Sequence, residues 1–122
     1  MEPESNFYEK VEKIVEKDPR YKVAAYAFVM LALNYTLSKL DKPRHVSGRE
    51  LLGGIKEFGL SQYGPMTKTV FDYWGVRTTR DFGEIVFNLV ENKLLGKTEE
   101  DKLQDFDNAY DFEEEFVKKY PW

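Results

Sequence analysis

Eleven consecutive apolar residues, Val23 to Leu33, stand in the first third of this 122-residue chain. The helix expected to contain them begins with Asp18 as N-cap and Pro19 as its first residue, and runs to about Leu40. A helix that is apolar on nearly every side must be surrounded by other elements. The run is also well short of the roughly 18 residues that cross a bilayer. We therefore predict a central helix with other helices packed around it, and no membrane partner.

Length and composition limit the class of protein. Apolar residues make up 42% and charged residues 33% of the sequence, which indicates a folded rather than a disordered chain. A chain of this length is expected to form one domain, residues 1–122. It has no cysteine and a single histidine, His45, which excludes disulfides, thiolate metal sites and multi-histidine zinc sites. The acidic first residues lack the apolar core of a signal peptide, so the expected location is the cytoplasm.

Residue pairs typical of helix starts recur along the chain. Each is a Ser, Thr, Asn or Asp followed three positions later by an acidic residue: Asn6 with Glu9, Ser47 with Glu50, Thr78 with Asp81, Thr98 with Asp101, and Asp111 with Glu114. A further helix is expected to begin at Pro65. Gly59 and Gly75 are predicted to end helices as left-handed residues, each followed by an apolar residue placed for a Schellman contact. These patterns predict a mainly α, compact, single-domain bundle of about six or seven helices.

Two of these helices have the outline of a helix-turn-helix. They are the helix from Pro65 to Trp74 and the helix from Thr78, joined by a short turn that contains Gly75. Residues 94–98 are predicted to form a loop or one short strand. If that strand pairs with a later segment, the result is a hairpin and a winged-helix-like fold.

The charge distribution weighs against nucleic acid as a partner. The residues that would contact a duplex are Lys68, Arg77, Arg80 and Asn88. Residues 20–97 carry twelve basic and seven acidic residues, whereas residues 98–116 carry nine acidic residues and one basic residue. Phosphates repel such an acidic segment, and the sequence pI is about 5.1. The sequence leaves open whether the acidic segment masks the more basic body.

His45 is the residue most open to a role in binding. It lies beside Arg44, directly before the predicted helix start at Ser47, and Arg49 follows in the first turn. A phosphate or carboxylate could bind there against the helix N-terminus, but an exposed loop histidine without function fits the same pattern. The pair Gly53-Gly54 inside this helix indicates the close approach of another helix or, less often, of a ligand.

Motifs for catalysis and metal binding are absent from the sequence. It contains neither a phosphate-binding loop nor a nucleophile elbow. Asp81 and Glu84 share a helix face, but the helix dipole favours carboxylates in a first turn without any function. A calcium loop starting at Asp105 fails because Tyr110 replaces the required glycine and Phe116 the required glutamate. We therefore expect a protein that is not an enzyme, with no metal and no cofactor.

Several segments together resemble a known group of proteins. They are His45-Val46-Ser47-Gly48 with Glu50-Leu51-Leu52, Tyr63-Gly64-Pro65-Met66, Trp74-Gly75-Val76, the stretch 81–91, and Asp111-Phe112-Glu113. This set resembles an uncharacterised, conserved-hypothetical family of short bacterial proteins, from about Tyr21 to Phe116. The resemblance implies a free-standing bacterial protein and no particular activity, ligand or cofactor. Glu and Lys together number 27 against two Gln, a bias typical of thermophilic proteins.

Three functions follow as hypotheses. The first is an interaction or regulatory protein that binds another protein or its own copy, through the acidic tail or an aromatic surface around Tyr63, Tyr73 and Trp74. The second is a winged-helix-like nucleic-acid binder that uses Arg77 and Arg80. The third is a small-molecule site near His45, Arg49 and the pair Gly53-Gly54. The first predicts an exposed apolar patch, the second a contiguous basic face, and the third a concave apolar pocket with His45 on its rim.

Overall fold

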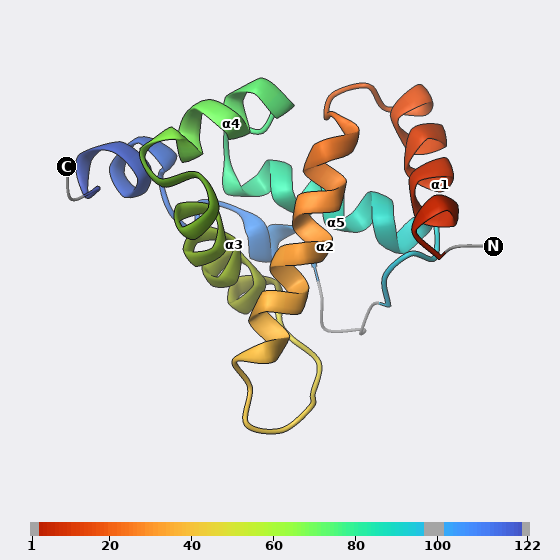
Figure 1. The fold of residues 1–122 in the computed structure, drawn as a ribbon, viewed down its shortest axis with the longest axis horizontal. Coiled ribbons are helices and arrows are strands. Elements are labelled where there is room, and N and C mark those ends of the chain that lie inside the picture. The colour runs from red at the N-terminus through yellow and green to blue at the C-terminus, as the bar shows by residue number, and fades with distance from the viewer. Residues whose placement is uncertain (1–2, 97–101, 121–122) are drawn as a thin grey trace.

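The computed structural model describes residues 3–96 and 102–120. Helices make up most of this part of the chain, and it contains no strand (Figure 1). The helices are α1 (Pro3–Lys17), α2 (Val23–Ser38), α3 (Gly48–Tyr63), α4 (Thr67–Trp74) and α5 (Thr79–Glu91). Three short turns complete the described elements: the 3-10 turns η1 (Gly64–Met66) and η2 (Leu103–Phe106), and the π turn η3 (Glu114–Lys118). The mainly helical, compact fold is confirmed, with five helices in the described residues instead of six or seven.

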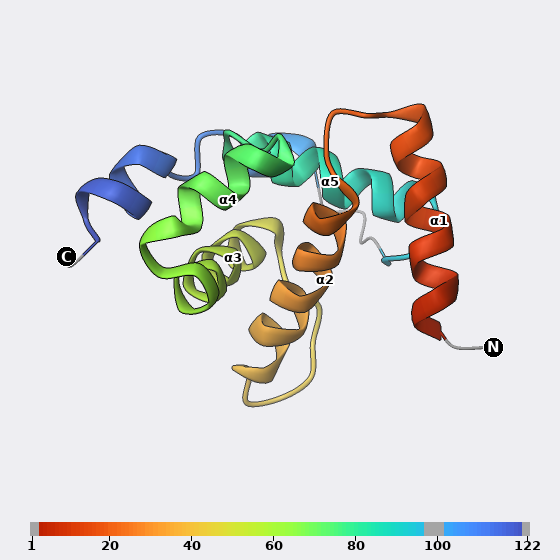
Figure 2. The ribbon, with the colours of Figure 1, turned by 45° about the horizontal axis from the view of Figure 1, so that its top comes forward.

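The apolar helix is central, as predicted. α2 contacts α1, α3, α4 and α5, and it runs between α1 on one side and α3 with α4 on the other (Figures 1 and 2). Its surroundings are not complete, because Leu31 is 55% exposed and Leu37 is 38% exposed. The predicted start was wrong. α2 begins at Val23, and Asp18 forms an ion pair with Arg20 in the loop instead of capping the helix.

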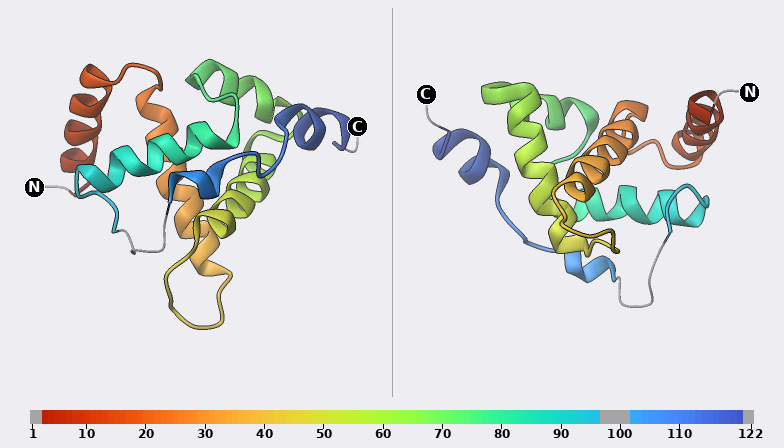
Figure 3. Two further views of the ribbon diagram at one scale, coloured as in Figure 1. Left: turned by 180° about the vertical axis from the view of Figure 1, so that it is seen from behind. Right: turned by 60° about the horizontal axis from the view of Figure 1, so that its bottom comes forward.

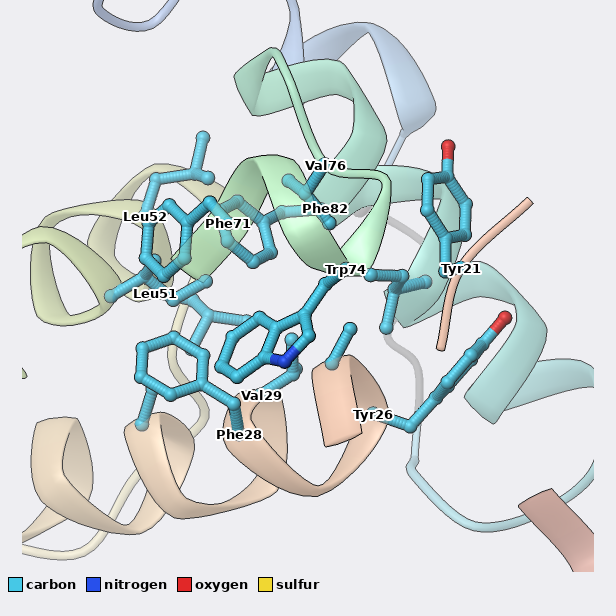
Figure 4. Packing of buried hydrophobic residues seen from close by; sticks show 14 of the residues in the cluster. Tyr21, Tyr26, Phe28, Val29, Leu51, Leu52, Phe71, Trp74, Val76 and Phe82 are labelled. Atoms are coloured by element: carbon cyan, nitrogen blue, oxygen red, sulfur yellow. The ribbon is translucent and has the colours of Figure 1, made fainter. Parts of the chain in front are cut away.

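Aromatic side chains fill the centre of the fold. Phe71 of α4 is fully buried, and its ring centroid lies 5.4 Å from that of Phe28 on α2 and 5.1 Å from that of Phe82 on α5. Trp74 stacks on Phe71 with its centroid 5.7 Å away, and Figure 4 shows its indole between α2 and α4. Edge-to-face and offset ring pairs of this kind add to the free energy of apolar burial.

Local hydrogen bonds fix the helix ends where the sequence predicted them most directly. Ser47 and Glu50 form the capping box of α3: the Glu50 N–H donates to Ser47 Oγ at 3.1 Å, and the Ser47 N–H donates to Glu50 Oε1 at 3.0 Å. Thr78 and Asp81 form the same box at α5. Gly75 ends α4 with φ of +91°, and the Val76 N–H donates to the Phe71 carbonyl as in a Schellman motif.

Other predicted boundaries were wrong or are not confirmed. α3 continues through Gly59 to Tyr63, because Gly59 is buried where a Cβ would lie 3.0 Å from the ring of Phe71. α1 begins at Pro3, so Asn6 lies within the helix and does not cap it. Residues 94–96 are irregular, while residues 97 and 98 lie outside the described part of the chain, so the hairpin is not confirmed. The predicted cap at Thr98 and Asp101 also lies outside it.

The described part of the acidic tail, residues 102–120, is folded against the helices (Figure 3). Instead of two regular helices it contains η2 and η3, joined by irregular chain. Phe106 of η2 is 2% exposed and lies between two glycines: a Cβ on Gly48 would be 2.9 Å from its ring, and a Cβ on Gly83 only 2.6 Å from its Cγ. The Thr79 hydroxyl donates to the Phe106 carbonyl at 2.6 Å. Tertiary contacts therefore determine the conformation of the tail.

Candidate ligand pocket

An apolar pocket opens beside His45, between α2, α3 and α5. Its volume is about 400 Å³. Apolar side chains form most of its wall: Leu33 and Leu37 from α2, Leu51 from α3, Val86, Phe87 and Val90 from α5, Leu95 after α5, and Phe106 from the tail. Its polar lining side chains are Arg44, His45 and Ser47. This is the concave apolar pocket with His45 on its rim that the small-molecule hypothesis predicts.

The loop between α2 and α3 borders the pocket. It is mostly polar and contains Pro43, and Leu40 near its start packs, partly buried, against the core. Val46 is the one residue of the segment 39–47 that is buried, and it anchors the loop to the core. The capping box at Ser47 then fixes the start of α3 at the edge of the pocket.

Arg44 is held in place by three acceptor atoms, two from Glu50 and one from His45. Its Nη1 and Nη2 donate to the two oxygens of Glu50 at 3.0 Å and 2.7 Å, and Nη1 also donates to the His45 carbonyl at 3.0 Å. The two hydrogen bonds from Arg44 to Glu50, with that from the Ser47 N–H, lower the pKa of Glu50 to about 2. The sequence suggested that a carboxylate could bind at this helix N-terminus. The Glu50 side chain supplies that carboxylate.

Arg49 and Arg80 lie together, but on the tail and not on the pocket. Arg80 Nη1 forms an ion pair with Asp107, at 2.9 Å and 3.1 Å from its two oxygens. Arg49 Nη2 donates to the backbone carbonyl of the same aspartate at 3.4 Å. Two of the predicted binding residues thus hold the acidic tail against α3 and α5.

The aromatic residues predicted as a binding surface are divided between core and surface. Trp74 is 7% exposed and belongs to the core, which corrects its placement in a surface patch. Tyr63 is half-buried, with its ring centroid 5.9 Å from that of Trp74. Tyr73 is 72% exposed, and Lys22 lies over its ring. Of these three residues, Tyr73 is therefore the one whose large aromatic side chain is mostly exposed.

The helix-turn-helix residues make contacts within the protein. Lys68 pairs with Asp72 at 3.1 Å, and Asn88 donates to Asp18 and to the Tyr26 hydroxyl. The tail turn η2 packs on α5, the helix that would enter a DNA groove. Arg77 is exposed and borders a smaller, more polar cavity of about 210 Å³ together with residues of the tail. The described surface therefore offers no row of unpaired basic side chains along α5.

A polar cluster ties the α1–α2 loop to α5. Arg20 bridges two carboxylates, with 2.7 Å to Asp18 and 2.8 Å to Glu84. The hydrogen bonds from Arg20 above all hold the pKa of Asp18 well below its usual range. Nearby, the Tyr21 hydroxyl donates to Asp81 at 2.6 Å, and burial raises the pKa of Tyr21. Every charged group here has an opposite charge or a hydrogen-bond donor beside it, which is typical of a structural cluster.

We expect Asp18→Asn to destabilise the protein in a pH-dependent way. The carboxylate has a lower pKa in the folded than in the unfolded chain, so its contribution is complete above the unfolded pKa and is lost as pH falls through the folded pKa. At pH 7 we expect the free energy of unfolding to fall by about 1 kcal/mol, a value reduced for the exposure of Arg20. The difference should shrink below about pH 4. Urea unfolding at pH 7 and at a pH below about 4 measures this difference. Asp41→Asn, which removes an exposed loop carboxylate elsewhere, is the control. A loss of stability that is the same at both pH values would contradict the role given to the Asp18 carboxylate.

Comparisons with known proteins add no assignment. No protein-family model, curated protein or solved structure matches the chain. Among the described residues, no helix has the length and apolar character needed to span a membrane, and no group of three or more His, Asp or Glu side chains is placed to hold a metal ion. The pocket residues on α5 and the tail were missed by sequence reasoning, because their apolar spacing is the same as that of ordinary core positions.

Proposed function

We propose that this protein binds a small apolar or amphipathic molecule in the pocket beside His45. The observation that carries the proposal is the cavity of about 400 Å³ with a mostly apolar wall and a few polar groups at one edge. Ligand pockets in proteins commonly have volumes of about 300–1,000 Å³ and this division of lining. Each methylene group moved from water into such a pocket contributes about 0.8 kcal/mol.

Rigid elements support the proposal. The wall residues come from three helices, and the capping box at Ser47 and Glu50 fixes the start of α3. Phe106 forms another part of the wall and is itself held between Gly48 and Gly83. A pocket built in this way is formed before a ligand arrives, so binding needs little ordering of side chains.

The other two hypotheses have less support from the geometry. The protein-partner hypothesis counted Trp74 among its contact residues, and Trp74 is in the core. The nucleic-acid hypothesis counted Lys68, Arg80 and Asn88, which are all bound to groups of the protein itself. Protein binding and nucleic-acid binding both remain proposals. The small-molecule hypothesis differs from them because a pocket supports it.

The test uses two leucines of α2 as a matched pair. Leu37 lines the pocket, and Leu31, also exposed, does not. Phenylnaphthylamine, a neutral apolar dye, should bind the native protein saturably with one site, followed by its fluorescence. Leu37→Trp should weaken binding by at least about tenfold because the larger side chain occupies the pocket, and Leu31→Trp should leave it within about twofold.

Two results would count against the proposed function. One is the absence of saturable binding of this dye and of a single-chain alcohol to the native protein. The other is an equal effect of the two tryptophan substitutions. A direct reporter is at hand because His45 is the single histidine of the chain, so its ring signals in an NMR spectrum come from the pocket rim.

A further inference from the structure

Arg44 offers a second pair of donors at the pocket edge. A guanidinium has five N–H groups. Three are used: two by Glu50, through the end formed by Nη1 and Nη2, and one by the His45 carbonyl. The two that are left are Nε–H and the second hydrogen of Nη2, which lie side by side on one edge of the planar group. None of the residues in the ranges 3–96 and 102–120 accepts a hydrogen bond from this edge.

This edge has the geometry for a carboxylate. Two parallel N–H groups of a guanidinium bind the two oxygens of a carboxylate bidentately, and the arrangement is stronger than a single neutral hydrogen bond. Glu50 already shows this mode on the other edge of the same group. The pair with Glu50 also holds the guanidinium in one orientation, and its side chain is 52% exposed, so a solute can reach it.

The charge around the pocket favours an anion. Among residues 3–96 and 102–120, Arg44 is the one charged side chain that lines it, and no carboxylate does. The loop that borders the pocket, from Lys39 to Ser47, carries three basic residues and one acidic residue, so it keeps one positive charge after Arg44 and Glu50 neutralise each other. The apolar wall of the same pocket comes mainly from α2, α3 and α5.

We infer that the ligand of this pocket is a single-chain monocarboxylate, free in solution, whose chain fills the apolar cavity and whose carboxylate binds the Nε–Nη2 edge of Arg44. The inference rests on the proposed function and makes it more specific. The apolar wall provides most of the affinity, and Arg44 selects the head group.

The experiment compares three probes with the same ten-carbon chain on the intact protein: decanoate, decanol and decyltrimethylammonium, by calorimetry and by the His45 ring signals. Decanoate should bind about tenfold tighter than decanol, and decyltrimethylammonium more weakly than either. Arg44→Gln should bring decanoate to within about twofold of decanol, without changing decanol. Lys42→Gln, which removes the same charge from the loop away from the pocket lining, should keep the preference.

A second variant changes affinity in the opposite direction. Glu50→Gln keeps a side chain that can form the capping box but removes the charge that competes for Arg44, so decanoate should bind about threefold tighter and decanol the same. Equal binding of decanoate and decanol, or a preference that survives Arg44→Gln, would overturn the inference and leave the proposed function standing. If no probe binds, the proposed function itself fails.

Discussion

Removal of residues 98–122 is expected to abolish the cooperative unfolding transition. The deletion takes three buried rings out of the core, Phe106, Phe112 and Phe116, and each is at most 4% exposed. Phe116 lies 5.4 Å from Phe71, ring centroid to ring centroid, in the middle of the fold. Truncating one such ring to alanine costs about 3–5 kcal/mol, and a domain of this size is stable by only about 5–15 kcal/mol.

The measurement is urea unfolding followed by circular dichroism. Because the deletion leaves no folded reference, the single change Phe116→Ala is the quantitative test, and its free energy of unfolding should be lower by about 4 kcal/mol. Glu113→Ala, at an exposed position of the same segment, should stay within about 0.5 kcal/mol of the native protein. A truncated chain that still unfolds cooperatively, with its native helix content, would show that the fold does not depend on the tail.

This result bears on the idea that the acidic segment masks a basic body. Asp107 forms an ion pair with Arg80, so the acidic segment does neutralise one basic side chain of the body. However, the same segment completes the core, so its deletion is not a clean test of masking. Asp107→Asn, which removes the charge and keeps the buried rings, separates the two roles. It should leave nucleic-acid affinity unchanged if masking has no part in the function.

Gly54→Ala is expected to destabilise the protein by about 2 kcal/mol, even though alanine is the better helix former. α3 approaches α2 closely at this point. A Cβ on Gly54 would overlap Thr36 Oγ1 and would lie 3.0 Å from Thr36 Cβ. The hydroxyl of Thr36 is buried and donates to the Ala32 carbonyl at 2.8 Å, so displacing it also breaks a buried hydrogen bond.

The neighbouring glycine is the control. A Cβ on Gly53 would have no atom outside its own helix within 4 Å. Gly53→Ala should therefore stabilise the protein by up to about 1 kcal/mol through helix propensity and the lower entropy of the unfolded chain. Urea unfolding of the two variants should give opposite signs. The same sign for both would show that the α2–α3 distance is not set at Gly54.

The helix ends that the sequence predicted correctly are those fixed by local hydrogen bonds. The boxes at Ser47 and Thr78 need only residues three positions apart, and the motif at Gly75 needs only the last turn of α4. Gly59 has the same local pattern as Gly75, but it faces Thr67 and Phe71, and packing against α4 carries α3 past it. The local sequence therefore allows a helix to end at such a glycine, and tertiary contacts determine whether it ends there.

The start of α2 and the form of the tail were not predictable for the same reason. Asp18 is directed to Arg20 and to Asn88, which lies 70 positions further along the chain, so it is not free to cap a helix. In the tail, Asp111 does cap as predicted, and its Oδ1 accepts from the Glu114 N–H at 3.0 Å. The helices expected around it are replaced by η2 and η3, because Phe106 and Phe116 must reach separate places in the core.

The candidate site was predicted in part. The sequence placed His45 beside Arg44 and before a helix start, and the structure adds the pocket next to them. It did not indicate that Glu50 occupies one edge of Arg44, because a capping residue and an ion-pair partner look alike in sequence. Nor did it indicate Val86, Val90 or Phe106, which come from segments far from His45 in the chain.

The position of Phe116 in the core has a consequence for the order of events during synthesis. Phe71, on which it packs, is made 45 residues earlier. At ~5–20 residues per second, a ribosome takes about 2–9 s to add those residues. Throughout that interval the apolar face of α3 is present without the rings of the tail, and the faces of α4 and α5 are added to it as those helices are made. During this period the nascent chain offers an apolar surface that a chaperone can recognise. In the folded protein the rings of the tail cover that surface.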